Sequence, residues 1–306
     1  MSDAREGSPR AVARLVSLVE DAHPALREVM AALAPFAGHA HVVGLTGAPG
    51  VGKSTATAAL IAAYREQGRR VGVLAVDPSS PFSGGALLGD RIRMSEHAAD
   101  PGVFIRSMAS RGHLGGLSWA APQAVRVLDA AGCEVVLLET VGVGQSEVEV
   151  AGTADTTVVL VAPGMGDGVQ AAKAGILEVA DILAVNKADR DGADRTVREL
   201  RQAVSMSERA PGQWRPRVVR TVATSAAGID DLVSAVDEHR THLGADGLRT
   251  RRTRRAAREV EGLALESLRA RVQHIGGVGL DALASDVVAG RIDPYAAADL
   301  LVDRLS

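Results

Sequence analysis

Residues 47–55 read Gly47-Ala48-Pro49-Gly50-Val51-Gly52-Lys53-Ser54-Thr55, a glycine-rich stretch that ends in Lys-Ser-Thr. It fits the pattern G-x-x-x-x-G-K-[ST], in which glycines let backbone N–H groups wrap around phosphates in conformations that a Cβ would obstruct. An apolar run precedes it at His41–Thr46, and a helical pattern follows over Lys53–Gln67. Because this strand–loop–helix context is absent from an ordinary glycine-rich turn, we predict that the stretch binds a nucleotide.

Two side chains of this loop have predicted chemical roles. Lys53 would bring a positive charge to the β- and γ-phosphates, and Ser54 would offer its hydroxyl to Mg²⁺. The helix that begins there would direct the positive end of its dipole at the phosphates. The other predicted nucleotide-binding members of the loop are Gly47, Ala48, Pro49, Gly50, Val51, Gly52 and Thr55.

Apolar runs and helical patterns alternate through the middle of the chain. The runs are rich in Val, Ile and Leu and are unbroken, as in strands that are covered on both faces. The predicted strands are His41–Thr46, Val71–Val76, Glu134–Thr140, Thr156–Ala162, Ile182–Asn186 and Val218–Ala223. The predicted helices between them are Lys53–Gln67, Ala121–Ala131, Gln170–Val179 and Arg195–Val204. This order predicts an α/β fold with a doubly wound, mostly parallel sheet.

A second motif, Asn186-Lys187-Ala188-Asp189, follows a predicted strand far downstream of the loop. The Asp189 carboxylate can accept hydrogen bonds from N1–H and the amino group of guanine, whereas adenine offers neither donor on that edge. Lys187 would lie along the base, and Asn186 would tie the base-binding loops together. Backbone N–H groups of Ser225, Ala226 and Ala227 would reach the guanine O6 atom. The sequence therefore predicts GTP rather than ATP.

Acidic residues at strand ends are candidates for a metal site. Asp77 and Glu139 each end a predicted strand, and the carboxyl ends of parallel strands face the ligand crevice. Glu139 and Gly142 stand where most GTPases place D-x-x-G, whose glycine senses the γ-phosphate. Asp90, in a glycine-rich segment, is a candidate switch carboxylate. We predict catalytic roles for Lys53 and these three acids, and metal binding by the acids together with Ser54.

The position after Gly142 bears on the rate of hydrolysis. Ras-like enzymes carry their water-positioning Gln there, but this chain has Val143, and Gln145 is out of register. We therefore expect slow intrinsic hydrolysis that a partner accelerates.

Helical extensions flank the predicted P-loop GTPase domain. Residues 11–37 carry apolar positions at helical spacing in two stretches, which Pro24 separates. After Leu243 comes a hinge-like stretch, residues 244–247, and then a long helical pattern and a short helical tail. The predicted organisation is a helical N-terminal extension over residues 1–38, the P-loop GTPase domain over 39–243 and a helical C-terminal arm over 244–306.

Composition limits the class of protein. The chain has 306 residues, of which 46% are hydrophobic, and its formal charge of −3 gives no footprint for nucleic-acid binding. Cys133 is the only cysteine, which excludes an intramolecular disulfide and a thiolate metal cage. No apolar run reaches the length of a membrane span. We expect a soluble cytoplasmic protein without a nucleic-acid or membrane partner.

Three further features are assigned ordinary structural roles. The arginine-rich run over Arg249–Arg258 lacks interleaved aromatic residues, so we expect a solvated helix face or salt bridges across a dimer. Residues 104–113 predict a polar surface loop, although Arg106, Arg111 or His113 in it would also suit stabilisation of charge or a contact with a partner protein. His239 and His242 lie three positions apart on a predicted helix without further clustered ligands, which disfavours metal binding.

Three stretches together resemble the MeaB/ArgK family, the G-protein chaperones of adenosylcobalamin-dependent methylmalonyl-CoA mutase. They are Val76-Asp77-Pro78-Ser79-Ser80-Pro81-Phe82-Ser83-Gly84-Gly85, Glu139-Thr140-Val141-Gly142-Val143-Gly144-Gln145-Ser146-Glu147 and Asn186-Lys187-Ala188-Asp189. The resemblance covers nearly the whole chain, and the two longer stretches are very specific to the family.

The resemblance implies Mg²⁺-dependent hydrolysis of GTP to GDP, homodimerisation through the C-terminal arm and a complex with an adenosylcobalamin-dependent acyl-CoA mutase. In that complex the GTPase would gate cofactor loading and help remove inactivated cofactor. Residues 164–173 resemble the family's additional switch, which relays the nucleotide state to the mutase. Its polar members are Asp167, Gln170 and Lys173.

Other GTPases and a kinase are the alternatives. A nickel-delivery GTPase would need a His-rich tract or paired cysteines, and a signal-recognition GTPase would need a Met-rich domain. This chain has neither feature. A kinase of the ArgK type would need a second pocket with a base that activates the acceptor, and the sequence shows no dedicated one.

Overall fold

The computed structural model describes residues 2–78, 97, 99–110, 120–140, 152–164 and 178–303. At residues 77, 78, 109, 110 and 273–279 it describes the backbone alone. The chain divides into two compact units, residues 1–252 and residues 253–306.

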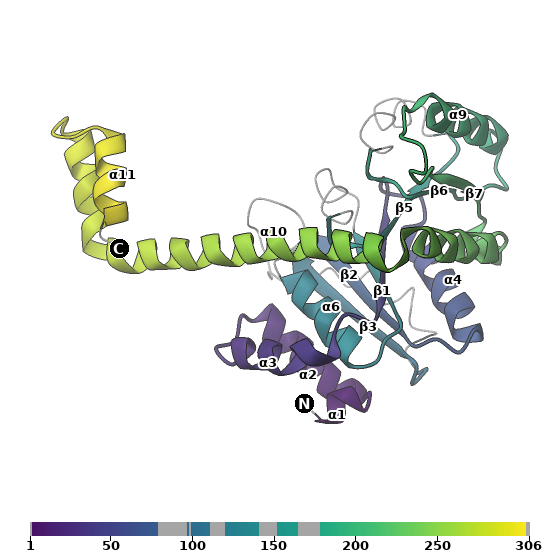
Figure 1. The fold of residues 1–306 in the computed structure, drawn as a ribbon, viewed down its shortest axis with the longest axis horizontal. Helices are drawn as coiled ribbons and strands as arrows, with labels where there is room; N and C mark the ends of the chain where they lie inside the picture. The colour runs from purple at the N-terminus through teal and green to yellow at the C-terminus, as the bar shows by residue number, and fades with distance from the viewer. Residues whose placement is uncertain are drawn as a thin grey trace. The chain divides into compact units, whose positions relative to one another are not determined.

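A seven-stranded sheet forms the centre of the first unit (Figure 1). Its strand order is β3-β2-β4-β1-β5-β6-β7, and every pairing between neighbours is parallel. The strands are β1 (His41–Thr46), β2 (Val71–Pro78), β3 (Val103–Ser110), β4 (Val135–Thr140), β5 (Thr156–Val161), β6 (Ile182–Val185) and β7 (Arg217–Arg220). The six strands predicted from apolar runs are all present, and the doubly wound α/β fold is confirmed.

The remaining strand, β3, corrects the prediction of a polar loop over residues 104–113. That prediction is wrong for residues 103–110, which pair with β2 along its whole length. Arg106 interrupts the apolar run of β3, but its guanidinium pairs with Glu20 of α2 and also donates to Ser17 Oγ at 3.1 Å. An ion pair to a covering helix thus lets a charged residue occupy a sheet edge. Residues 111–113 lie outside the described part of the chain.

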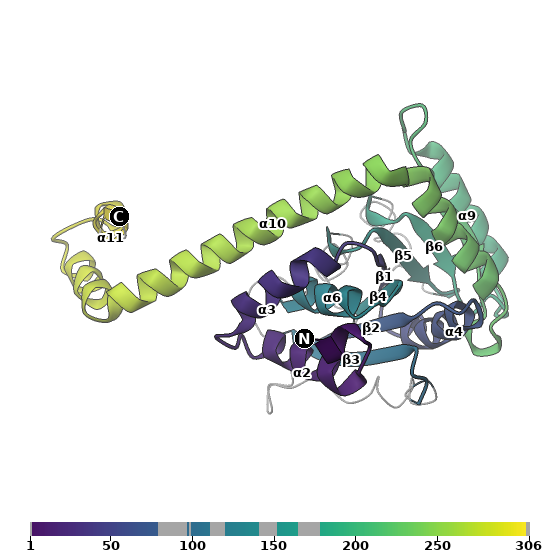
Figure 2. The same ribbon diagram turned by 60° about the horizontal axis from the view of Figure 1, so that its bottom comes forward.

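Helices pack on both faces of the sheet (Figure 2), and the first of them come before the first strand in the sequence. Pro24 lies between α2 and α3, as the spacing of apolar residues predicted. The helices of the described residues are α1 (Ser2–Arg5), α2 (Pro9–Glu20), α3 (Leu26–Leu33), α4 (Lys53–Glu66), α6 (Ala120–Ala130), α9 (Ala193–Met206), α10 (Ile229–Val288) and α11 (Pro294–Asp303), with short 3₁₀ turns at Ala34–Phe36 and Ala223–Ser225.

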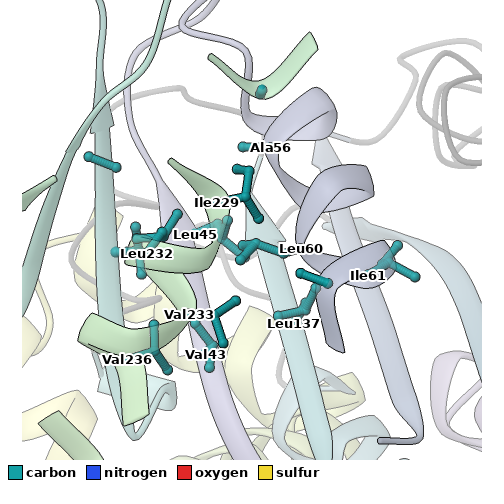
Figure 3. Packing of buried hydrophobic residues seen from close by; sticks show 14 of the residues in the cluster. Val43, Leu45, Ala56, Leu60, Ile61, Leu137, Ile229, Leu232, Val233 and Val236 are labelled. Carbon is teal, nitrogen blue, oxygen red and sulfur yellow. The ribbon is translucent and has the colours of Figure 1, made fainter. Parts of the chain in front are cut away.

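One face of the sheet is covered by α4 and the first turns of α10. Leu60 and Ile61 of α4 and Leu232 and Val236 of α10 lie over the odd-numbered residues of β1 and β4, such as Leu137 (Figure 3). All of these side chains are fully buried. The large buried apolar area fixes α4, and therefore the loop that leads into it, against the sheet.

The opposite face is covered by two groups of helices. The N-terminal helices α1–α3 and α6 pack on the even-numbered residues of β2 and β4, while α9 packs on β5 and β6. Val16 and Val19 of α2 are fully buried in the first of these cores. The N-terminal extension is therefore part of the sheet's packing rather than an independent element.

The helix α10 changes direction at Gly244, whose φ of 58° and ψ of −169° leave the helical region. A glycine adopts this conformation without the steric cost that a Cβ would add. The distal part of α10 and all of α11 make up the second unit. Within the described residues, no helix combines the length and the apolar character needed to cross a membrane.

Candidate nucleotide site

The phosphate-loop candidate joins β1, the middle strand of the sheet, to α4. Gly47 has a φ of +143°, and a Cβ there would lie 2.2 Å from the carbonyl oxygen of Leu160. Gly52 has a φ of +93°, and a Cβ would lie 2.6 Å from Nδ2 of Asn186. Both positions therefore require glycine, for backbone conformation and for space. Gly50 has a φ of +79°, and no described residue lies within 4 Å of a virtual Cβ there.

The Lys53 ammonium lies over this loop. Its Nζ donates to the carbonyl oxygens of Gly47 at 2.7 Å and Ala48 at 3.1 Å, and the residue is 8% exposed. Lys53 is also the first residue of α4, so its charge adds to the positive end of the helix dipole. Together they make this end of the sheet a site for anions.

Next to the lysine, Glu139 is held by two hydroxyls. This carboxylate lies near the carboxyl end of β4 and is 1% exposed. Its Oε1 accepts from Ser54 Oγ at 2.7 Å, and its Oε2 accepts from Thr57 Oγ1 at 2.7 Å. A serine hydroxyl and a carboxylate side by side are the hard oxygen donors that Mg²⁺ prefers, so these residues fit the predicted metal.

The candidate base-reading loop is tied to the phosphate loop by Asn186. Its Nδ2 donates to the carbonyl oxygen of Val51 at 2.8 Å, and its Oδ1 accepts from Thr221 Oγ1 at 3.3 Å and from the Ala223 N–H at 3.1 Å. Asn186 is 2% exposed. The three loops that follow β1, β6 and β7 are thus joined through one buried amide.

The neighbours of Asn186 lie toward solvent. Lys187 has a φ of +56°, and its Nζ donates to the carbonyl oxygen of Gly50 at 2.7 Å. Asp189 is exposed, and so are Ser225, Ala226 and Ala227, in the loop after β7. These residues lie in the loops that follow the adjacent strands β6 and β7. The contacts of Asn186 hold both loops close to the phosphate loop. Their roles in reading guanine stay predictions.

Other predicted site residues lie outside the described part of the chain. They are Asp90, Gly142, Asp167, Gln170 and Lys173, and the side chain of Asp77. The backbone of Asp77 belongs to β2, where it pairs with Ala109.

Two residues of the site were missed by the sequence analysis. Thr57 lies three positions after Ser54, on the same face of α4, and that spacing was the available signal. Thr221 follows β7 and contacts Asn186 from a distance of 35 residues along the chain, which no local pattern reveals.

A second polar cluster occupies the other end of the same strands. We call it the amino-edge cluster, and it comprises His41, Asp155, Thr156, Asp181, His239, Arg251 and Arg252. Thr156 Oγ1 lies 2.8 Å from His41 Nε2 and 2.8 Å from His239 Nδ1. His41 is 1% exposed, and burial lowers its pKa to about 4 even though Asp155 acts in the opposite direction. His41 is therefore neutral at pH 7.

Two arginines of the predicted arginine-rich run join this cluster. Arg251 makes a two-pronged pair with Asp181, at 2.9 and 2.8 Å, and Arg252 pairs with Asp155 at 3.1 and 2.7 Å. Burial raises the pKa of Asp181, but His239 and Arg251 outweigh it and bring the value to about 2. Arg251 and Arg252 therefore do not lie on a solvated helix face, as one of the two expectations had it, but pair with buried carboxylates of the same chain.

The family was identified by comparison with known proteins. The model of the family described as "Methylmalonyl Co-A mutase-associated GTPase MeaB" matches residues 12–276. The chain belongs to the MeaB family. It is a GTPase, as the family is. A protein of Pyrococcus abyssi whose name calls it a GTPase is 47% identical over 98% of this chain and 94% of its own length.

Two further relatives carry different names. GTPase ArgK of Escherichia coli is 39% identical over 79% of this chain and 76% of its own length. A mouse protein named "Methylmalonic aciduria type A homolog, mitochondrial" is 41% identical over 67% of this chain and 50% of its own. A solved structure named as a "LAO/AO transport system kinase" superposes with a TM-score of 0.70 at 29% identity, covering 99% of this chain and 95% of the other.

Proposed function

We propose that this MeaB-family GTPase binds GTP and GDP with Mg²⁺ at the carboxyl edge of the sheet. The observation that carries the proposal is the buried contact between Ser54 and Glu139 beside the Lys53 ammonium. Ser54 and Glu139 would hold the ion, directly or through water, with Asp77 and Asp90 as further ligands. When held there, Mg²⁺ would supply positive charge that offsets the negative charge of the phosphates.

In this proposal, the chain's own residues supply positioning and charge. Lys53 would turn from the carbonyl oxygens of its loop to the phosphates, and Gly142 would sense the γ-phosphate. Asp189 would accept the two guanine donors, while Lys187 and the buried Asn186 keep the base loop against the phosphate loop. Because Val143 stands where Ras-like enzymes have a catalytic Gln, the proposal includes slow hydrolysis without a partner.

We propose an adenosylcobalamin-dependent acyl-CoA mutase as the partner, with methylmalonyl-CoA mutase as the first candidate. The description of the matching family names this mutase. The GTPase would gate cofactor loading and protect or reactivate the mutase, and the segment with Asp167, Gln170 and Lys173 would relay the nucleotide state. We place this activity in the cytoplasm as part of the same proposal.

We further propose a homodimer formed through the C-terminal arm, residues 244–306. Among the described residues, the exposed large hydrophobic side chains other than Met206 lie between Val260 and Val302, within this arm. Val260, Leu263 and Leu268 are 66%, 45% and 44% exposed. Exposed apolar residues gathered on one helix are typical of a surface that another protein covers.

The dimer is tested by sedimentation velocity. Leu263→Arg combined with Leu268→Arg should convert the dimer into a monomer, because two unpaired charges would be buried in the interface. Met206→Arg, at an exposed apolar residue of the first unit, is the matched control and should remain dimeric. A dimer that survives the arm substitutions would contradict the proposed interface.

The mutase partnership is tested by complex formation and cofactor transfer. The chain is mixed with apo-methylmalonyl-CoA mutase from the same source, and adenosylcobalamin uptake is followed spectroscopically with GDP or with a non-hydrolysable GTP analogue. We expect uptake to depend on which nucleotide is bound. Lys53→Ala should remove that dependence. Uptake that is identical with both nucleotides would contradict the gating role.

A kinase is the second candidate, because the superposed structure carries the name of one. The two functions differ in the fate of the γ-phosphate. With γ-labelled GTP and ATP, a GTPase releases inorganic phosphate without an acceptor, whereas a kinase leaves label on protein or on an added amino acid. We expect release from GTP alone.

A further inference from the structure

The buried Glu139 carboxylate is held from two sides by one helix. Ser54 and Thr57 are three residues apart in α4, so their side chains lie on the same face, above the end of β4. Each hydroxyl is 2.7 Å from a different oxygen of the carboxylate. Two contacts to two oxygens fix the rotation of the carboxylate plane as well as its position.

The Thr57 hydroxyl has two acceptors within reach. Its Oγ1 lies 2.7 Å from Glu139 Oε2 and 3.1 Å from the carbonyl oxygen of Lys53, four residues earlier. A hydroxyl has a single hydrogen to donate, and a carboxylate forms the shorter and stronger bond. The two distances follow this order, so Glu139 is the favoured acceptor of this hydrogen bond.

The two hydroxyls have different tasks when a metal is bound. The Ser54 oxygen belongs to the nucleotide-loop pattern and would offer its lone pairs to Mg²⁺. Thr57 is outside that pattern and is fully buried. Its contact with Glu139 Oε2 leaves the other oxygen, Oε1, directed toward Ser54, so this contact would not have to be broken for an ion to bind on the Ser54 side.

We infer that Thr57 is a positioning residue for the Mg²⁺ site. It orients the Glu139 carboxylate so that the ion and its waters meet a preformed oxygen donor. This inference rests on the proposed Mg²⁺–nucleotide function and names a residue that acts through Glu139 without touching the ion. Loss of the hydroxyl weakens binding of Mg²⁺ to the nucleotide complex and leaves Mg²⁺-free nucleotide binding unchanged.

The experiment measures binding of a fluorescent GDP analogue as free Mg²⁺ is varied, beginning in EDTA. Thr57→Val keeps the shape of the side chain but removes the hydroxyl. Thr57→Ala also removes the hydroxyl, and alanine has a higher helix propensity than valine. Thr57→Ser restores it. Thr196→Val is the matched control, because Thr196 is also a buried helical threonine that donates to the carbonyl oxygen four residues earlier, at 3.2 Å, in α9.

We expect the half-saturating Mg²⁺ concentration to rise about tenfold in Thr57→Val and in Thr57→Ala, as for the loss of a hydrogen bond to a charged group. Thr57→Ser and Thr196→Val should stay within about twofold of the unmodified chain. Affinity in EDTA should be the same for all. An unchanged Mg²⁺ requirement in the Val and Ala variants would overturn the inference.

Two other results would also overturn it. If Thr57→Ser shifted the Mg²⁺ requirement as far as Thr57→Val, packing of the methyl group rather than the hydroxyl would be responsible. If the unmodified chain bound nucleotide equally well with and without Mg²⁺, the proposed metal site itself would fail. The first result leaves the proposed function intact, so the two failures are distinguishable.

Discussion

The two ends of the sheet carry polar clusters that differ in how their groups are satisfied. At the carboxyl edge, Lys53, Ser54 and Lys187 contact the loops and the carboxylate that a nucleotide complex would use. At the amino edge, Arg251 and Arg252 meet Asp181 and Asp155 in paired, largely buried contacts with main-chain carbonyls alongside. The first cluster has contacts that a ligand can replace, whereas the second is closed within the protein.

The contacts at the two edges suit different roles. Lys53 and Lys187 donate to main-chain carbonyl oxygens of the phosphate loop, and such hydrogen bonds can be exchanged for hydrogen bonds to a ligand at little cost. Buried ion pairs are expensive to open, because each partner would be left charged and unpaired. Both edges belong to the same strands, so the candidate nucleotide site and the ion pairs of Arg251 and Arg252 are separated by the length of a strand.

The largest expected effect is on folding stability, at the amino edge. Arg252→Ala removes the guanidinium that pairs with Asp155. Because Asp155 is fully buried, its carboxylate would be left without this partner, and the free energy of unfolding should fall by about 3–5 kcal/mol. Urea denaturation measures this. Arg249→Ala removes an exposed pair with Asp246 and should cost about 0.5 kcal/mol or less. An equal loss in the free energy of unfolding in the two variants would contradict the distinction between an arginine in a buried ion pair and one in an exposed ion pair.

The next effect is on nucleotide affinity, at the carboxyl edge. Lys53→Ala should weaken GTP and GDP binding by about 3 kcal/mol, or roughly 100-fold, because a charge-assisted contact to the phosphates is lost. Calorimetric titration measures it. The Arg252→Ala variant should bind nucleotide as the unmodified chain does while folded. A Lys53→Ala variant with unchanged affinity would contradict the assignment of the phosphate loop.

Asp189→Asn should reduce GTP affinity by about 2 kcal/mol, or roughly 30-fold, and should weaken the preference for GTP over ATP. The amide presents a donor where guanine also presents donors. Competition titrations with GTP, ATP and xanthosine triphosphate measure the preference. Asp191→Asn, at a second exposed acid of the same loop, should change nothing. Retained GTP affinity in Asp189→Asn would count against its role as base reader.

The smallest effect is the pH dependence that His41 adds. Its folded pKa of about 4 is below the ordinary value of 6.5, so the unfolded chain binds the extra proton between these values. This contribution to stability is fully present above pH 6.5 and is lost as the pH falls toward 4. Between pH 7 and pH 5 it amounts to roughly 1.5–2 kcal/mol.

The measurement is urea denaturation at pH 7 and pH 5. His41→Asn should lose less stability between the two values than the unmodified chain, by about that amount. His39→Asn, at an exposed neighbouring histidine, should keep the full pH dependence. Parallel pH dependences in all three proteins would show that His41 is not held neutral by burial.

The loops at the carboxyl edge could be located from the sequence because they carry short motifs, and the roles of their residues in binding stay predictions. Six strands were visible as unbroken apolar runs, and the phosphate and base loops follow three of them. The sequence missed β3 because Arg106 interrupts its apolar run, and the ion pair with Glu20 that makes this tolerable joins residues 86 positions apart.

The amino-edge cluster was not predictable either, because its ion pairs also join residues that are far apart in the sequence. Arg251 meets Asp181 across 70 residues and Arg252 meets Asp155 across 97, and these pairs depend on how strands and helix are brought together. From sequence, the arginine-rich run showed only charge. Thr57 was missed although its spacing from Ser54 placed it on the same helix face, because only the fold shows that the Glu139 carboxylate lies opposite that face.

The most direct test of the proposed GTPase with a mutase partner is the steady-state GTPase rate of the purified chain, alone and with methylmalonyl-CoA mutase from the same source. We expect a rate well below about one turnover per second alone, rising severalfold or more with the mutase. A rate of several per second for the isolated chain would contradict the expectation of slow intrinsic hydrolysis. An unchanged rate with intact GTP binding would contradict the mutase partnership.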